Sequence, residues 1–219
     1  MSVLTIGGII AAAFRIGTTN AGTIIGAGLL WILTIWIPYL NVGTTIAMLN
    51  MIVKLGRGES FTPMEIFNKE YRANMGEFFL LFGFVIMGIF GGLLFAVIPG
   101  IILYFAWSQA FLLMEAQGMS PLEAIRASNK MTYGDKWNMF LGVFLLQVIV
   151  GGAFGILGSI FGTEPPNAVT GIISFAGAIC YFTLMIGAYA HIYGTLEARH
   201  FGAAAAALDT PPHAAFAGT

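Results

Sequence analysis

Side chains able to carry out acid–base or ligand chemistry are few in this sequence and lie far apart. His191 stands near the end of the last apolar run, close to Tyr189, Tyr193 and Glu197. It could bind haem, a pigment or a proton, but an interfacial histidine satisfied by a neighbour is the interpretation we favour. Glu115 closes another apolar run. An intramembrane carboxylate is a candidate proton site by default, and a position at the membrane surface is the favoured alternative.

No arrangement of these residues predicts catalysis. A hydrolase or transferase needs a base, a nucleophile or a metal held together by the fold. The His, Cys, Asp and Glu residues have no spacing that resembles a zinc site. Gly88, Gly91 and Gly92 lie inside an apolar run without the Lys and Ser/Thr of a phosphate loop, and the single Cys180 excludes an internal disulfide. We therefore expect a protein that is not an enzyme and that holds no cofactor and no metal.

The composition predicts the elements that position these residues. The 219-residue chain is 58% hydrophobic and only 9% charged, whereas roughly a quarter of the residues in a soluble domain are charged. Charged residues are absent from four runs that are each as long as the ~20 residues of a membrane crossing, or longer, namely 16–53, 78–114, 137–163 and 165–196. The sequence therefore predicts an all-α integral membrane protein. Its net charge of −1 argues against a nucleic-acid partner.

The distribution of charge predicts about six crossings arranged as three hairpins. All nine Lys and Arg residues fall in segments that this arrangement puts on one face, whereas the turns at Pro38, Pro99 and Pro165-Pro166 carry only Glu164. Under the positive-inside rule the basic face and both termini are cytoplasmic. The sequence leaves open whether the leg over 44–56 spans fully.

We expect one membrane domain over 1–201, followed by a disordered Ala/Pro-rich tail over 202–219. The three hairpins cover about 20–55, 78–117 and 137–197. Amphipathic helices at the cytoplasmic membrane surface link them, over about 2–16, 62–76 and 120–134. In the second of these, the residues at helical spacing that would form an apolar stripe are Met64, Phe67, Tyr71 and Met75.

Two polar segments share a pattern that predicts an internal repeat. Thr62 with Glu65, and Ser120 with Glu123, each flank a proline in the arrangement of a helix-capping box. Fourteen residues after each box begins stands a glycine followed by an acid, Gly76-Glu77 in one copy and Gly134-Asp135 in the other, and an apolar run follows at once. The predicted unit is a surface helix, a bend and a hairpin.

Small and polar side chains inside the apolar runs predict helix packing. Each hairpin contains a Gly-x-x-x-Gly spacing in its first helix, formed by Gly22 and Gly26, Gly88 and Gly92, and Gly151 and Gly155. Such residues let helices approach closely in lipid, although chance is a real alternative in a chain with 29 glycines. Asn50, Gln109 and Gln147 are expected to hydrogen-bond between helices.

Basic residues beside the two boxes are candidates for contacts with lipid or with a partner. They are Lys69, Arg72, Arg126, Lys130 and Lys136, with Trp137 as an interfacial aromatic. A cation near an anionic membrane surface contributes ~1 kcal/mol of attraction. Ordinary determinants of topology explain the same residues, and the two interpretations are compatible.

The run Gly118-Met119-Ser120-Pro121-Leu122-Glu123-Ala124-Ile125-Arg126-Ala127-Ser128, with Gly134, Trp137 and Phe140, resembles a pattern in prokaryotic multi-pass proteins. These are the YciC-like proteins and the membrane domain attached to some glycerophosphoryl diester phosphodiesterases. The resemblance covers about 99–160 and, more loosely, 55–98. It implies about six helices with amphipathic segments between them, in the prokaryotic inner membrane. The chain has no room for the phosphodiesterase barrel, so that activity is not carried over.

Together these features predict a non-catalytic inner-membrane protein. We expect a scaffold or accessory subunit that contacts lipid and associates with other integral membrane subunits or with itself. A transporter or channel-like protein for a small solute or lipid is the alternative that the internal repeat suggests. Its weakness is that each repeated unit holds two crossings, so that the copies would be parallel and not inverted.

Overall fold

The structure is a computed structural model that describes residues 3–161 and 168–202. Within these residues every regular element is a helix, which confirms the predicted all-α class. The turn at Pro165-Pro166 and the predicted disordered tail, except Gly202, lie outside the described residues.

The helices follow one another with short connections. The α-helices are α1 (Ile6–Thr19), α2 (Ala21–Thr34), α3 (Pro38–Arg57), α4 (Met75–Phe95), α5 (Val97–Trp107), α6 (Ala110–Gln117), α7 (Pro121–Met131), α8 (Lys136–Phe161) and α9 (Ala168–Glu197). Two short 3₁₀ helices, η1 (Pro63–Phe67) and η2 (Lys69–Arg72), follow α3. A π-helical turn, η3 (Ala198–Gly202), extends α9.

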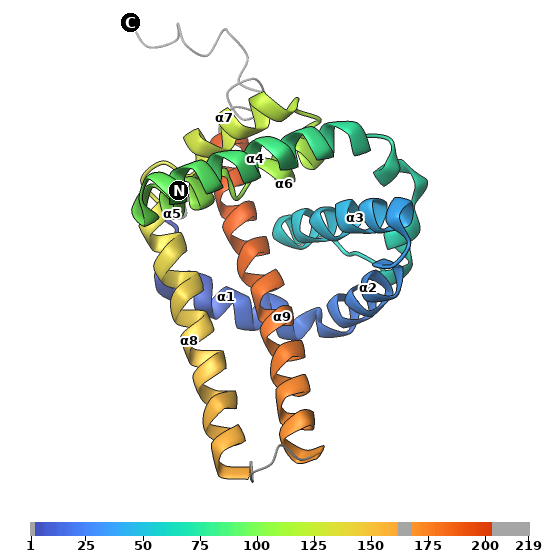
Figure 1. Ribbon diagram of the computed structural model, residues 1–219, viewed down its shortest axis with the longest axis vertical. Helices are drawn as coiled ribbons and strands as arrows, with labels where there is room; N and C mark the ends of the chain where they lie inside the picture. The colour runs from blue at the N-terminus through green and yellow to red at the C-terminus, as the bar shows by residue number, and fades with distance from the viewer. Residues whose placement is uncertain (1–2, 162–167, 203–219) are drawn as a thin grey trace, which may run out of the picture.

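α9 is the helix against which α1, α3 and α8 pack. Figure 1 shows α1 crossing α9 and the end of α3 reaching it, while α8 runs beside α9. Both crossings require glycine. A Cβ at Gly187 would lie 2.7 Å from the carbonyl oxygen of Ala13 on α1, and a Cβ at Gly194 would overlap the backbone of Gly56 on α3. Contact between helix backbones replaces the hydrophobic driving force that lipid does not supply.

Four helical segments are long and apolar enough to cross a membrane, and a bent pair can form a fifth span. The four are Met75–Phe95, Val97–Gln117, Lys136–Phe161 and Ala168–Gly202; α1 and α2 qualify together and are bent by 77°. The chain is thus built as a multi-pass membrane protein. The six predicted crossings are not found in the described residues, because α2 has only 14 residues and α3, which carries Asn41, Asn50 and two threonines, is not apolar enough to qualify.

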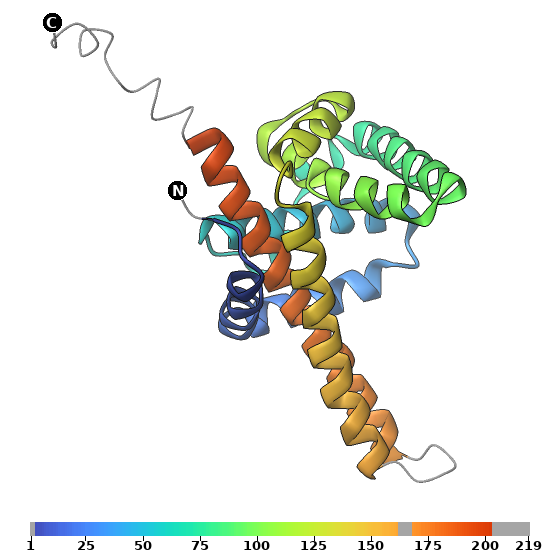
Figure 2. The same ribbon diagram turned by 90° about the vertical axis from the view of Figure 1, so that its left-hand side faces the viewer.

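The apolar helices form two pairs that point in different directions. Residues 75–117 fold back on themselves, so that the rings of Phe78 and Phe111 lie 5.5 Å apart. Asp135 lies just before α8 and Arg199 just after α9. Their side chains form an ion pair at 2.5 Å, which joins the start of α8 to the end of α9. Figure 1 shows α4 at a steep angle to α8 and α9, and Figure 2 shows that it lies to one side of their upper halves. The apolar pairs therefore do not stand side by side as a row of parallel hairpins.

The predicted surface helix over 2–16 is instead a packed element. Thr5 caps α1 by accepting a hydrogen bond from the backbone N–H of Gly8 at 3.1 Å. Ile9 is fully buried, and a Cβ at Gly142 on α8 would lie 2.7 Å from it. Ala13 and Gly17 of α1 lie against Gly187 of α9 in the same way. Because small side chains at a spacing of four form a flat face, α1 lies directly against two long helices.

The predicted amphipathic helix over 62–76 does not form. Two 3₁₀ helices replace it because Asn68 has an extended backbone, with ψ of 131°, and its side chain accepts from the N–H of Glu70 at 3.1 Å to cap η2. The expected apolar stripe is absent as well: Met64 is 68% exposed, whereas Ile66 is buried.

The third predicted surface helix is present as α7, and it ends before Gly134, which adopts a φ of +89°. Few non-glycine residues adopt this conformation, so Gly134 makes the sharp bend into α8. Gly76, its counterpart in the predicted repeat, lies inside α4 with ordinary helical geometry. The two segments therefore match at their capping boxes but differ at the bend.

Candidate functional site

A buried carboxylate at the polar end of α9 joins three helices. Glu197 accepts from Arg57 on α3 through Nε at 3.0 Å and Nη2 at 2.5 Å. It also accepts from the hydroxyl of Tyr193 at 2.8 Å and from Nε2 of Gln117 on α6 at 2.9 Å. A buried charge is tolerated when it is paired and hydrogen-bonded in this way. Sequence reasoning missed the cluster because Arg57 and Glu197 are 140 positions apart.

A polar cavity of about 670 Å³ lies beside this cluster, between the α1–α2 bend, the end of α3 and the last turns of α9. His191 lines it together with Arg15, Arg57 and Glu59. The tyrosines near His191 in sequence do not join it there, because the hydroxyl of Tyr193 bonds Glu197 and that of Tyr189 bonds Tyr104. The structure thus gives His191 a charged setting that its neighbours in sequence did not indicate.

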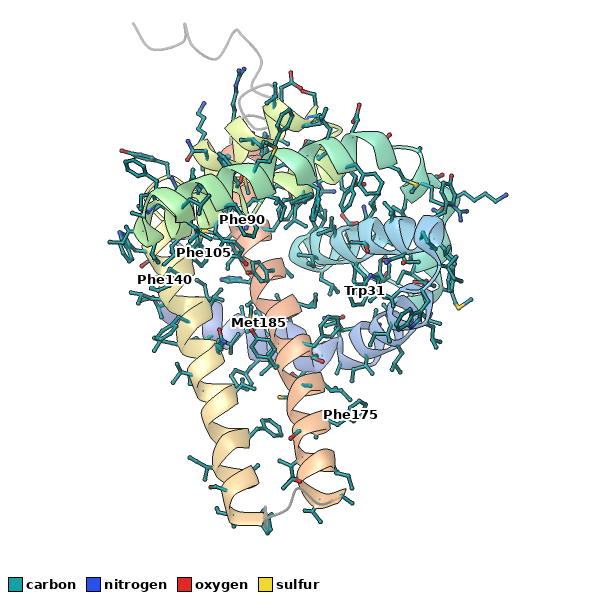
Figure 3. The ribbon with its side chains drawn as sticks, viewed as in Figure 1. Trp31, Phe90, Phe105, Phe140, Phe175 and Met185 are labelled. Carbon is teal, nitrogen blue, oxygen red and sulfur yellow. The ribbon has the colours of Figure 1, made fainter. Side chains whose placement is uncertain are left out.

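A second, mainly apolar cavity of about 380 Å³ lies where α4, α5, α8 and α9 meet. The hydroxyls of Tyr104 and Tyr189 hydrogen-bond at 3.0 Å at its edge, and Gln147 lines it. Phe105 and Phe140 also line it, and they pack edge to face with ring centroids 5.8 Å apart. In Figure 3 these two residues lie near the upper end of α8, below α4. Gln147, expected to bond between helices, is thus at a cavity wall.

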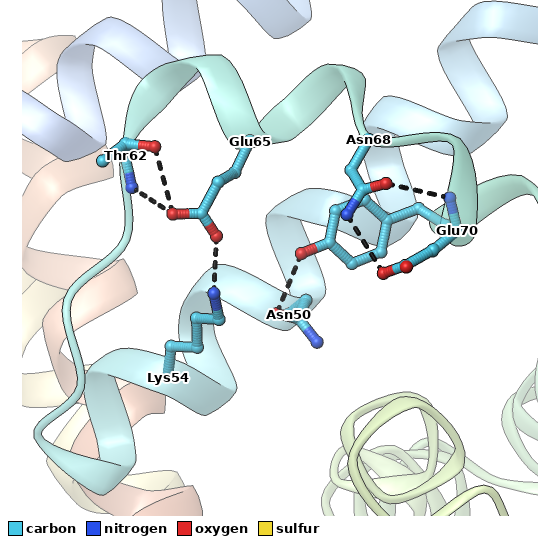
Figure 4. Close-up of polar contacts among 7 residues, drawn as sticks. Asn50, Lys54, Thr62, Glu65, Asn68 and Glu70 are labelled. Carbon is cyan, nitrogen blue, oxygen red and sulfur yellow. Dashed lines mark hydrogen bonds and ion pairs between the residues drawn. The ribbon is translucent and has the colours of Figure 1, made fainter.

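The first capping box also anchors its segment to α3, as Figure 4 shows. Glu65 accepts from the N–H of Thr62 at 2.9 Å and from its hydroxyl at 3.0 Å, while its other oxygen accepts from Lys54 at 2.5 Å. Tyr71 donates to Asn50 at 3.2 Å. Asn50, expected to bond another membrane helix, therefore bonds the polar segment.

The Lys54–Glu65 pair shifts the pKa of both residues. Partial burial by itself would raise the pKa of Glu65, but the hydrogen bonds from Lys54 and Thr62 outweigh burial and hold this pKa below its usual value. The hydrogen bond to Glu65 raises the pKa of Lys54 against the opposing effect of burial. Both residues are therefore held in their charged forms near neutral pH.

The second capping box starts a helix that supports a break in the membrane segment 97–117. Glu123 accepts from the N–H of Ser120 at 3.1 Å and from its hydroxyl at 2.7 Å. Further along α7, the buried hydroxyl of Ser128 accepts from the N–H of Gln109 at 3.2 Å and donates to the carbonyl of Ala106 at 2.7 Å. These bonds provide partners for the N–H of Gln109 and the carbonyl of Ala106, at the break where α5 ends and α6 begins.

Two unpaired buried oxygens lie on or beside α6. Within the described residues, Oε1 of Gln109 and Oε1 of Glu115 are buried and accept no hydrogen bond. Gln109 uses its amide nitrogen within its own turn, bonding Ser108 at 3.0 Å, and so does not bridge two helices through that group. Among the described residues no group of three His, Cys, Asp or Glu side chains could hold a metal ion.

The basic candidates come from two places and do not form one cluster. Lys69 and Arg72 belong to η2, and Arg72 packs over Gly43 of α3. The others are on α7 or at the start of α8, where Lys136 donates to Asn129 at 2.9 Å. The candidates whose side chains are exposed are Lys69, Arg126, Lys130 and Trp137.

The predicted Gly-x-x-x-Gly spacings differ in what they contact. On α2, Gly26 packs against Pro63, whereas Gly22 has open space around it. On α4, Gly88 packs against Trp107 and Gly92 against Gly100, so this face holds α4 against α5. On α8, Gly151 and Gly155 both have open space around them as far as the described residues extend. Only part of the predicted set therefore packs inside the described chain.

The helical fold, the apolar spans and the polar clusters at their ends define a multi-pass α-helical membrane protein. Comparisons with family models, with curated proteins and with solved structures find no match for the chain.

Proposed function

We propose that the protein is a non-catalytic scaffold or accessory subunit, which contacts lipid and associates with a larger assembly of integral membrane proteins. The observation that carries this proposal is the open glycine face of α8. Gly151 and Gly155 meet no other described part of the chain. The close crossings of α9 with α1 and α3 depend on the same residue type. An unused face of this kind is suited to a helix of another integral membrane subunit.

The surroundings of this face support contact within the bilayer. The apolar side chains Ile156, Ile160 and Ile172 are 61%, 65% and 69% exposed. Phe175 projects outward from the lower part of α9 in Figure 3 and is 65% exposed. Exposed apolar surface of this extent is unusual for a soluble monomer, and lipid or a partner helix covers it at no desolvation cost.

We further propose that the chain lies in the inner membrane of a prokaryote with both termini in the cytoplasm, and that it contains an internal repeat. The resemblance to YciC-like proteins supports the location. The capping boxes at Thr62 and Ser120 support the repeat. The basic residues Lys136 and Arg199 at one end of the α8–α9 pair support the orientation, because basic residues favour the cytoplasmic side.

Purification from the native membrane in mild detergent tests the accessory-subunit proposal. We expect integral membrane proteins to co-purify with the wild-type chain, and their yield to fall about tenfold in a Gly151→Leu/Gly155→Leu variant, because the added side chains separate the backbones. Gly83→Leu/Gly91→Leu on α4 is the matched control, since these glycines also have open space around them. A wild-type chain that purifies without any partner, or equal yields from both variants, would contradict the proposal.

A further inference from the structure

The polar cavity beside α9 has the composition of a binding site. Its volume of about 670 Å³ lies within the range of about 300–1,000 Å³ typical of small-molecule sites. Residues of α1, α3 and α9 and of the turns that follow them line it. Its polar lining comprises Arg15, Thr19, Asn20, Arg57, Glu59, His191 and Thr195. Separate elements therefore direct donors and acceptors to one space.

The charged side chains that line this cavity differ in whether they have an ion-pair partner. Arg57 is neutralised by its two bonds to Glu197, so it contributes little net charge. Arg15 on α1 and Glu59 beyond α3 form no ion pair within the described residues. Among the described residues that line the cavity, Arg15 is a cation and Glu59 a carboxylate without an ion-pair partner, and His191 is an additional polar group. A ligand that carries a phosphate and an amine matches this pattern.

The position of the cavity favours a ligand at the membrane surface. His191 and Thr195 belong to the last two turns of α9, next to the charged residues that end this apolar helix. Ile16 and Leu55 line the same cavity and offer apolar contacts. A phospholipid headgroup meets polar and apolar surroundings together in such a place.

We propose that this cavity binds a phosphate group linked to an amine, as in the headgroup of phosphatidylethanolamine. Arg15 and His191 donate to the phosphate, and Glu59 accepts from the ammonium group. The same chemistry occurs in soluble O-phosphoethanolamine, which lacks acyl chains. The site does not depend on the proposed partner subunit, because all of its residues come from this chain.

Native mass spectrometry of the delipidated full-length protein tests the site. The probes are phosphatidylethanolamine, phosphatidylglycerol and O-phosphoethanolamine, each titrated in detergent. We expect the wild-type chain to bind phosphatidylethanolamine more tightly than phosphatidylglycerol. Loss of a charge-assisted hydrogen bond in Arg15→Gln should weaken binding of both lipids about tenfold. Glu59→Gln should remove the preference for the amine while retaining phosphatidylglycerol binding.

Matched variants outside the cavity separate specific binding from general charge effects. Arg126→Gln on α7 and Glu70→Gln on η2 remove the same charges at exposed positions, and we expect neither to change the affinities. If O-phosphoethanolamine binds as tightly as the lipid, the ligand is a soluble compound; if only the lipid binds, it is a membrane component. Both results support the site. Unchanged binding in Arg15→Gln, or an unchanged preference in Glu59→Gln, would overturn it, provided that thermal unfolding shows both variants to be folded.

Discussion

At the scale of single residues, Glu197 carries the most interactions of the polar groups described above. Its carboxylate is held by Arg57, Tyr193 and Gln117, so it links α3, α6 and α9. It lies next to the crossing of Gly56 and Gly194, where two backbones touch. A charge placed at a close crossing fixes the register of the two helices, because any slip would separate it from its partners.

Neutralising Glu197 should therefore destabilise the fold. We expect Glu197→Gln to lower the free energy of unfolding by about 2 kcal/mol, less than for a fully buried pair because the Arg57 side chain is 33% exposed. Thermal unfolding in detergent measures this change. The double variant Arg57→Gln/Glu197→Gln should be more stable than the sum of the single effects predicts, by about 1 kcal/mol. Strict additivity would show that the two charges do not interact.

At the scale of elements, the segment that joins α3 to α4 is held by contacts and not by helical periodicity. Glu65 completes the capping box of η1 and bonds Lys54 of α3, and Tyr71 bonds Asn50. The apolar spacing in this segment is equally compatible with one amphipathic helix. Asn68 interrupts such a helix, because its side chain accepts from the N–H of Glu70 and so caps the start of η2.

This attachment should depend on pH. The pKa of Glu65 is lowered in the folded protein, so the stabilisation is present above the unfolded value of 4.5 and is lost as the pH falls through the folded value. The raised pKa of Lys54 retains the pair up to and beyond pH 10.5. We expect Glu65→Gln to cost about 1 kcal/mol at pH 7 and less at pH 3. Unfolding curves at both pH values, with Glu70→Gln as control, check this; an equal cost at both would contradict the ion pair.

At the scale of the whole molecule, the two apolar pairs differ in direction. α4 runs at a steep angle to α8 and α9 (Figure 1), and the lower parts of α8 and α9 project away from the remaining helices. A flat bilayer cannot contain both pairs upright. The orientation of the chain therefore depends on which of the two helix pairs crosses the bilayer. The lower part of α8 and α9 carries no charge and is the surface most suited to the hydrocarbon core.

Cysteine accessibility tests this orientation. In a Cys180→Ser background, we expect a cysteine at Asn129 on α7 to react with a membrane-impermeant maleimide only from the cytoplasmic side. A cysteine replacing Glu164 should react only from the opposite side, because the positive-inside rule places the basic ends of α8 and α9 in the cytoplasm. Labelling of both positions from the same side would refute the proposed topology.

The sequence by itself determined the features that depend on local chemistry. The apolar runs predicted a helical membrane protein, and Thr62 and Ser120 with their glutamates predicted two helix starts, because caps are satisfied within four residues. The bend at Gly134 was predicted for the same reason, since a positive φ favours glycine.

Only the tertiary structure decided which helices meet. The pairing of Arg57 with Glu197 joins residues 140 positions apart, and the cavity lined by Arg15, Glu59 and His191 forms where α1, α3 and α9 converge. Hydropathy cannot predict these contacts, because lipid-facing and packed positions are equally apolar in a membrane helix. Close approach of helix backbones at glycine and a few ion pairs determine which helices meet. These contacts join segments that lie far apart in the sequence.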